Sequence, residues 1–147
     1  MFEGEVKLND ARFEGRVMMS NCVFTRSLEL QRSRFDQQVR IEQCEFGNDL
    51  VLQYSQNDGD VSLLHSKIGR DVMLQGLSSR GKWQMGNLQC QGSIDLSRGD
   101  FHEEFSANYI EVGRRVFVSN CRFYGNFSMH SALVTEMVNL KRSRVYC

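Results

Sequence analysis

The sequence predicts an all-β solenoid, a fold in which one chain winds through a series of similar coils of short strands. Three observations support this prediction. Apolar residues recur every eleven positions along the whole 147-residue chain. Within each unit they come in pairs two positions apart, such as Val17 and Met19 and then Cys22 and Phe24, which is the side-chain period of a strand. Glycine recurs near the ends of these segments, where the chain has to turn.

The eleven-residue period defines three rows of residues that we expect to face the interior. Two of them are apolar at every position, and they run from Val6 to Val138 and from Leu8 to Leu140. The third row is interrupted only at Asn57 and Ser79. Its other members are Phe2, Phe13, Phe24, Phe35, Phe46, Ile68, Cys90, Phe101, Val112, Phe123, Val134 and Val145. Because no linker interrupts the rows, we expect one β-helix domain over residues 1–147, which could also be a segment of a longer protein.

An eleven-residue repeat can also specify a right-handed helical coiled coil. That alternative requires helix-forming residues at helical spacing, whereas the repeats here are rich in Val, Ile, Phe, Ser and Cys and contain recurrent glycine. The pattern therefore favours strands.

Glycines gather at one corner of the repeat. Six of the twelve glycines share one position, and three more lie beside it: Gly4, Gly15, Gly59, Gly81, Gly92 and Gly125, followed by Gly47, Gly69 and Gly113. We expect this corner to adopt a backbone conformation that other residues resist.

Each unit contains two inward segments, so two units, or 22 residues, complete a four-sided coil. The runs ARFEGRVMMSNCVF and SRFDQQVRIEQCEF place small residues (Ala11, Cys22, Ser33, Cys44) at one inward position and phenylalanine at another. This arrangement resembles the pentapeptide-repeat family, in a divergent form whose faces alternate between five and six residues. The resemblance implies a right-handed quadrilateral parallel β-helix of nearly seven coils. The chain departs from the family's usual Ala-(Asp/Asn)-Leu pattern.

Composition narrows the classes of partner. Eighteen basic residues balance eighteen acidic ones, so no overall field attracts nucleic acid or an anionic membrane. We therefore do not expect a nucleic acid partner. The sequence shows neither a membrane span nor a secretion signal, and this favours a cytoplasmic location. Four of the five cysteines, Cys22, Cys44, Cys90 and Cys121, fall in inward positions, which predicts core thiols and no metal site.

Arginines recur on an outward column in which residues 22 apart should stack. The column reads Arg12, Arg34, Gln56, Ser78, Asp100, Arg122 and Arg144, with an arginine pair near each end. Stacked like charges repel one another. For the first pair, we expect Glu14 and Asp36 to relieve part of this repulsion.

The second pair is flanked by Tyr124 and Tyr146 instead of acids. Arg142 adds another positive charge, whereas we expect Asp100 to neutralise Arg98. The sequence therefore predicts a docking patch at Arg122, Arg142 and Arg144 for an acidic partner or phosphates, with Arg12 and Arg34 as a weaker candidate. The alternative is a solvated face whose arginine stems cover the apolar layer.

Asn57 interrupts the third row, the one that begins at Phe2. It lies in the polar run SQNDGD, and no larger neighbouring residue makes up for the volume of the missing aromatic ring. A buried amide without partners would cost about 1–3 kcal/mol, so we expect Asn57 to bond to the coil backbone or the face to bulge there. A second interpretation is a notch that binds a ligand, formed by Asn57, Asp58 and Asp60.

No nucleophile, phosphate-loop or zinc-ligand motif is present, and we expect neither catalysis nor a cofactor. The predicted function is a scaffold that binds a protein partner. One alternative is a self-assembling element, because the repeats reach both ends of the chain and open coil ends favour homo-oligomers. A weaker alternative is a polysaccharide-active enzyme that uses the corner acids Asp49 and Asp71.

Overall fold

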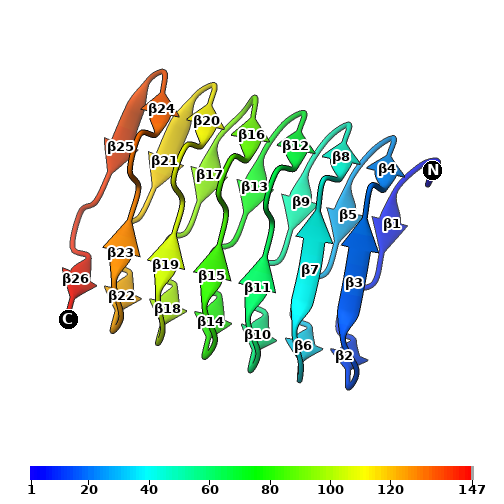
Figure 1. Ribbon diagram of the computed structural model, residues 1–147, viewed down its shortest axis with the longest axis horizontal. Coiled ribbons are helices and arrows are strands. Elements are labelled where there is room, and N and C mark those ends of the chain that lie inside the picture. The colour runs from blue at the N-terminus through cyan, green and yellow to red at the C-terminus, as the bar shows by residue number, and fades with distance from the viewer. Residues whose placement is uncertain (147) are drawn as a thin grey trace.

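The computed structural model describes residues 1–146, and these residues form 26 strands and no helix. The strands are mostly two residues long and belong to four parallel sheets that run the length of the molecule (Figure 1). Each strand pairs with the strand 22 residues away, as Val6 does with Leu28 and Arg12 with Arg34. The predicted 22-residue coil is therefore confirmed.

Two of the sheets have seven strands each. Sheet 1 contains β1 (Val6–Lys7), β5 (Leu28–Glu29), β9 (Leu50–Val51), β13 (Val72–Met73), β17 (Ile94–Asp95), β21 (Arg115–Phe117) and β25 (Met137–Asn139). Sheet 2 contains β2 (Arg12–Phe13), β6 (Arg34–Phe35), β10 (Gln56–Asn57), β14 (Ser78–Ser79), β18 (Asp100–Phe101), β22 (Arg122–Phe123) and β26 (Arg144–Val145).

The other two sheets have six strands each. Sheet 3 contains β3 (Val17–Ser20), β7 (Val39–Glu42), β11 (Val61–Ser62), β15 (Trp83–Gln84), β19 (Phe105–Ser106) and β23 (Phe127–Ser128). Sheet 4 contains β4 (Val23–Phe24), β8 (Glu45–Phe46), β12 (Lys67–Ile68), β16 (Gln89–Cys90), β20 (Glu111–Val112) and β24 (Leu133–Val134).

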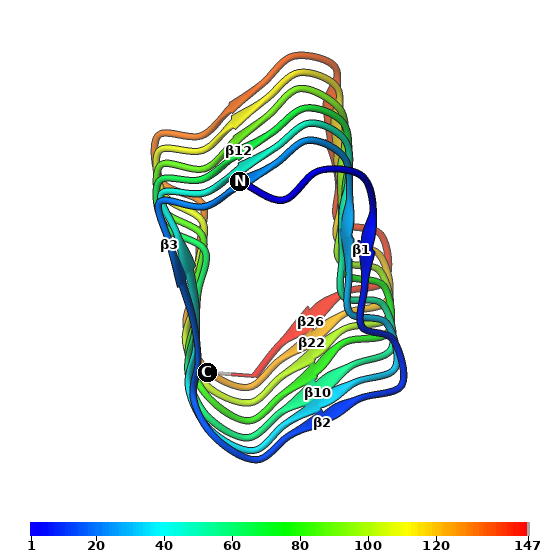
Figure 2. The same cartoon turned by 90° about the vertical axis from the view of Figure 1, so that its right-hand side faces the viewer.

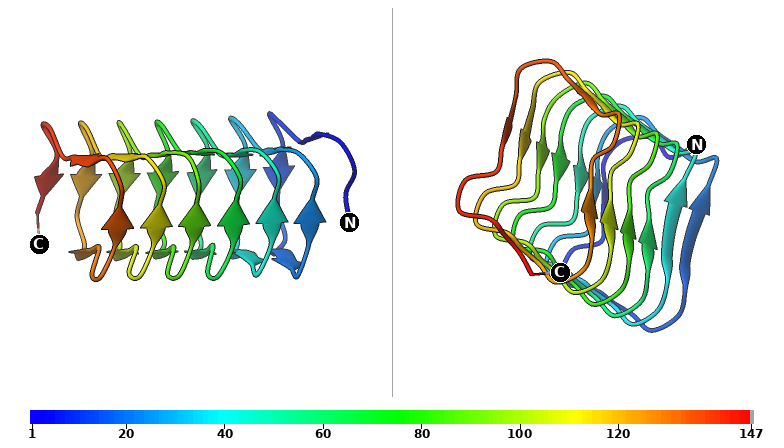
Figure 3. Two further views of the ribbon diagram at one scale, coloured as in Figure 1. Left: turned by 90° about the horizontal axis from the view of Figure 1, so that it is seen from above. Right: turned by 60° about the vertical axis from the view of Figure 1, so that its left-hand side comes forward.

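The coil has four sides and is right-handed. Viewed from the N-terminal end, the chain runs clockwise through β1, β2 and β3 while later coils recede from the viewer (Figure 2). The coils stack at even intervals, and the two termini lie at opposite ends of the rod (Figure 3). The four-sided β-helix predicted from the sequence is thus the observed fold.

The corners differ from the prediction. A left-handed backbone conformation recurs every eleven residues, with φ between 52° and 63° at the non-glycine positions. These residues are Asp10, Asn21, Arg32, Gln43, Tyr54, His65, Asn87, Arg98, Tyr109, Asn120, Ser131 and Arg142, and Gly76 completes the row. The expectation that the glycine corner supplies the special conformation was therefore wrong for most of those glycines, since only Gly4 among them has a positive φ.

The glycines at this corner instead allow the backbones of neighbouring coils to approach each other closely. A Cβ built on Gly69 would lie 2.3 Å from the carbonyl oxygen of Gly47, and one on Gly47 would lie 2.1 Å from that of Thr25. No side chain fits in these spaces, because the neighbouring atoms are backbone. The glycine Cα hydrogens can face these carbonyl oxygens directly, a contact typical of adjacent strands.

The core fills the interior of the coil as the rows predict. Phenylalanines of neighbouring coils stack face to face, with ring centroids 4.8 Å apart for Phe24 and Phe46 and 5.1 Å apart for Phe101 and Phe123. In the end coils the same rows are less covered, and Phe2 and Val145 are 47% and 53% exposed. The interior is therefore best packed in the middle coils.

Small inward residues bond to the backbone of the preceding coil. The Ser55 hydroxyl donates to the Leu30 carbonyl (2.7 Å) and accepts from the Ser33 amide (3.1 Å). The Cys121 thiol likewise donates to the Leu96 carbonyl at 2.8 Å. Where Leu77 takes the equivalent position, the corresponding backbone groups bond to each other instead, and the Ser55 amide donates to the Leu52 carbonyl at 3.3 Å.

Cys44, Cys90 and Cys121 are buried, and Cys22 is partly buried, as the row assignments predict. The fifth cysteine, Cys147, lies outside the described residues. Burial raises the pKa of the Cys121 thiol to about 11 and that of Cys90 to about 12. These buried side chains remain neutral thiols at neutral pH, which makes them poor nucleophiles.

The raised pKa values predict a loss of stability in alkali. The folded-state thiol pKa lies above the unfolded one, so above about pH 9 the unfolded chain releases thiol protons that the folded protein retains. Each such thiol lowers the free energy of unfolding by at most about 1.4 kcal/mol per pH unit until its folded pKa is reached. Urea unfolding at pH 8, 9 and 10 measures this slope.

Cys121→Ser is the matched variant for this prediction, because Ser33, Ser55 and Ser143 occupy the same column. It should show a shallower decline than the parent protein, since serine does not ionise in this range. The substitution leaves every lysine and tyrosine of the protein in place. Parallel stability curves for parent and variant would contradict the assignment.

Candidate binding site

The outward column of sheet 2 has the predicted order. Arg12, Arg34, Gln56, Ser78, Asp100, Arg122 and Arg144 are successive ladder partners. They point outward because their neighbours at the next position, such as Phe35 and Phe123, are buried and successive strand residues face opposite sides. The column therefore forms a continuous surface along one side of the rod.

Acidic residues engage the two N-terminal arginines. The nearest nitrogen–oxygen distances are 2.9 Å for Arg12 with Asp36 and 3.0 Å and 3.1 Å for Arg34 with Asp36 and Asp58. The hydrogen bond from Arg12 is the main cause that lowers the pKa of Asp36, and the hydrogen bond from Arg34 lowers it further. Asp36 thus relieves the repulsion as predicted. Among residues 1–146, however, Glu14 forms no ion pair with these arginines, and Asp58 takes that place.

The C-terminal arginines are paired differently. Arg122 binds Asp100 through two hydrogen bonds, Nε to Oδ1 at 2.7 Å and the terminal nitrogen to Oδ2 at 2.8 Å. This bidentate pair raises the pKa of Arg122 and occupies both oxygens of Asp100. The expectation that Asp100 neutralises Arg98 was therefore wrong. In the part of the chain that the structure describes, Arg98, Arg142 and Arg144 have no ion pair.

These side chains surround a shallow hollow of about 570 Å³. It is lined by Arg98, Asp100, Asn120, Cys121, Arg122, Arg142, Ser143 and Arg144, a set that we call the C-terminal arginine patch. Four arginines and one aspartate give it a formal charge of +3, in a protein whose net charge is zero. Arg98 and Arg142 belong to the left-handed corner row, whereas Arg122 and Arg144 belong to strands β22 and β26. The corner and the sheet together position the cluster.

An aromatic ladder flanks the patch. The rings of His102 and Tyr124 stack at 5.0 Å and those of Tyr124 and Tyr146 at 4.9 Å, with interplanar angles of 8° and 10°. Tyr124 and Tyr146 are 41% and 50% exposed. Because the rings cover one another's faces, their edges and hydroxyl groups point away from the stack. The ladder gives the patch a fixed border with hydrogen-bonding groups.

The three residues of the expected notch do not come together. Asn57 is 2% exposed, and its amide nitrogen donates to the Gly59 carbonyl at 2.8 Å, which confirms the predicted backbone bond. Asp58 is engaged by Arg34, and Asp60 Oδ1 accepts a hydrogen bond from the Lys82 amide at 2.8 Å. The asparagine thus belongs to the core, and the two aspartates connect neighbouring coils through these ionic and hydrogen bonds.

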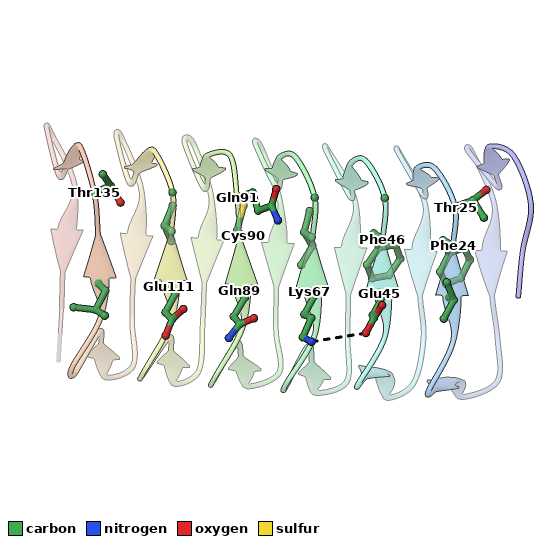
Figure 4. A pocket seen from close by; sticks show the side chains of 17 residues that line it. Phe24, Thr25, Glu45, Phe46, Lys67, Gln89, Cys90, Gln91, Glu111 and Thr135 are labelled. Carbon is green, nitrogen blue, oxygen red and sulfur yellow. Dashed lines mark ion pairs between the residues drawn. The ribbon is translucent and has the colours of Figure 1, made fainter.

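A larger trough on sheet 4 was not predicted. It has a volume of about 910 Å³ and runs across strands β4 to β24, past an outward column that includes Glu45, Lys67, Gln89 and Glu111 (Figure 4). One wall of the trough is low because the glycines that form it, Gly47, Gly69 and Gly113, have no side chains. The Lys67 and Glu45 head groups lie 3.9 Å apart, so opposite charges within the trough partly compensate each other. The glycine column was the sequence signal for this feature.

The corner acids hold the backbone. Asp49 Oδ1 accepts a hydrogen bond from the Asp71 amide at 2.9 Å, and Asp71 Oδ1 accepts one from the Ser93 amide at 2.8 Å. Each carboxylate therefore stabilises the corner of the next coil.

Among residues 1–146 no group of three His, Cys, Asp or Glu side chains has the arrangement of a metal site. The same residues contain no helix long and apolar enough to cross a membrane.

No protein-family model matches the chain, and neither a curated protein nor a solved structure does. The resemblance to pentapeptide-repeat proteins therefore stays a prediction. So does self-assembly through the end coils.

Proposed function

We propose that this protein is a non-catalytic β-helical scaffold that binds an acidic segment of a protein partner through the C-terminal arginine patch. The observation that carries the proposal is the contrast between the two ends of one column. Arg12 and Arg34 have acidic partners, whereas Arg144 and its neighbours Arg98 and Arg142 have none among the described residues.

The electrostatics of the patch support an anionic ligand. Arg122 and Arg144 are ladder partners in adjacent strands, and like charges in this arrangement repel each other. Asp100 compensates only one of them. A carboxylate from a partner would relieve the remaining repulsion, and the planar guanidinium group is suited to bidentate binding of carboxylates.

The geometry favours a polypeptide segment. The hollow joins a corner to a strand and is open along the rod, so it can accept successive carboxylates of an extended chain rather than one enclosed small molecule. The exposed tyrosine hydroxyls at its border can bond to peptide groups of the partner. The four-sided coil also supports a relationship to pentapeptide-repeat proteins, which we include in the proposal.

Charge reversal tests the patch. For a fluorescent decaglutamate peptide followed by anisotropy at low salt, the double variant Arg142→Glu/Arg144→Glu should bind about tenfold more weakly or worse. Two exposed ion pairs at up to about 1 kcal/mol each account for this loss. Binding by the parent protein should weaken as salt is added, because exposed charges are screened.

The matched control is Arg16→Glu/Arg26→Glu, which makes the same change in net charge at two exposed arginines near the other end of the rod. It should retain most of the affinity. Equal losses in both double variants would mean that only overall charge matters and would contradict the proposal. Tighter binding of a single-stranded oligonucleotide than of the peptide would also contradict it.

A further inference from the structure

Two polar atoms in the core have no hydrogen-bond partner within the protein. These atoms are Asn57 Oδ1 and Trp83 Nε1. Every other buried side-chain nitrogen or oxygen atom of residues 1–146 has a hydrogen-bond partner. Asn57 is 2% and Trp83 1% exposed. Leaving such groups unpaired costs about 1–3 kcal/mol each, so a native core normally supplies a partner.

The orientation of the Asn57 amide is fixed by its other bonds. Its nitrogen donates to the Gly59 carbonyl and to Ser79 Oγ, both at 2.8 Å. The Ser79 hydroxyl donates its single hydrogen to the Gly81 carbonyl at 2.9 Å. A flipped amide would place two oxygens against each other at Gly59. Oδ1 is therefore the free atom, and it is an acceptor.

The packing explains why space remains beside these atoms. In the aromatic column of sheet 2, Asn57 and Ser79 occupy two successive positions between Phe35 and Phe101. The lost volume is partly restored by Trp83, whose indole packs edge to face against Phe101 with ring centroids 6.1 Å apart. An indole and a small amide do not reproduce a stack of phenyl rings, so some space is left unfilled.

That space is a cavity of about 10 Å³ whose lining residues are all buried. Asn57 and Trp83 both line it, and its other walls are apolar side chains such as Phe35, Val39 and Leu77. One water molecule requires about 10–15 Å³ on this measure, together with at least two polar partners. The cavity thus reaches the lower limit of volume for one water, and two of its lining residues carry an unpaired donor and an unpaired acceptor.

We propose that a single water molecule is bound in this cavity, where it accepts a hydrogen bond from Trp83 Nε1 and donates one to Asn57 Oδ1. The site is independent of the arginine patch. An ion does not fit its chemistry, because no charged group lines the cavity, and an apolar occupant would leave both polar atoms unpaired. The water connects strand β10 with strand β15 of the next coil and takes the place of the missing aromatic contacts.

The test uses the indole N–H of Trp83, which is the only tryptophan in the chain. In ¹⁵N-labelled protein, this N–H should show a dipolar cross-peak at the water frequency with the sign of a long-lived complex, although the side chain is buried. Asn57→Leu removes the acceptor and fills the cavity, so the cross-peak should be lost. The exposed control Asn126→Leu should retain it.

Two results would overturn the proposal: a folded parent protein without the indole–water cross-peak, or an unchanged cross-peak in Asn57→Leu. If Asn57→Leu does not fold, the parent spectrum still decides. A high-resolution crystal structure of the parent gives a second readout. It should show one density peak within hydrogen-bond distance of both atoms, and a direct contact between Trp83 Nε1 and Asn57 Oδ1 would exclude the water.

Discussion

Gly69→Ala is expected to lower the free energy of unfolding by about 2–4 kcal/mol, because inserting a methyl group into closely packed backbone forces the coils apart. The added Cβ would lie 2.3 Å from the Gly47 carbonyl oxygen and 2.9 Å from its carbon. The coils cannot separate freely, since the Gly69 amide donates to the Phe46 carbonyl at 2.8 Å. Urea unfolding followed by circular dichroism measures the change.

Gly15→Ala is the matched control. A Cβ at Gly15 meets no atom within 4 Å, and Gly15 is also a corner glycine, one position later in the eleven-residue repeat than Gly69. Alanine there should leave stability unchanged or raise it by about 0.4–1 kcal/mol, because it restricts the unfolded chain. If the two variants lost equal stability, the corner would depend on glycine's flexibility rather than on close approach.

Phe101→Ala should cost about 3–5 kcal/mol, which is the usual range for removing a fully buried aromatic side chain. Phe101 is 1% exposed and contacts three aromatic neighbours, with centroid distances of 5.1 Å to Phe123, 4.9 Å to Phe105 and 6.1 Å to Trp83. The surrounding backbone is held in ladders on both sides, so it cannot collapse into the cavity. Equilibrium unfolding in urea gives the change.

Phe2→Ala makes the same substitution in an end coil. Phe2 is 47% exposed, although it stacks on Phe24 at 4.7 Å. It should cost less than about 1.5 kcal/mol, because much of its surface is already in contact with water. Similar costs at Phe101 and Phe2 would show that the coil frays little and that its interior is uniformly stable, contrary to the exposure pattern.

Periodicity predicted the fold, because a strand alternates its side chains and a coil repeats its register. Once Val6, Leu28 and Leu50 are placed in one inward row, the pairing of their strands follows. The corner conformation did not follow. Left-handed backbone favours Gly, Asn and Asp, but here it also occurs at Arg32 and Tyr54, where the ladders of the fold impose it.

The candidate site was predicted in part. The arginine column was predicted because residues 22 apart stack in neighbouring coils. Which acidic residue binds each arginine depends on how far the side chains extend from one coil to the next. Asp100 binds Arg122 in the next coil rather than Arg98, its neighbour in sequence. The one-water cavity also escaped prediction. Asn57 was identified as an anomaly, but its connection to Trp83 depends on how side chains of two different sheets meet inside the coil.

This protein has two repeat lengths, eleven residues for the inward rows and 22 for the stacked columns, so its core and its surface respond differently when a repeat is lost or gained. Loss or gain of one eleven-residue unit would leave every inward row in phase. It would nevertheless rotate all downstream outward residues by half a turn, so that one continuous column such as the arginines of sheet 2 would divide between opposite sides of the rod. Gain or loss of 22 residues would instead lengthen or shorten that column, and the interior would not distinguish the two events.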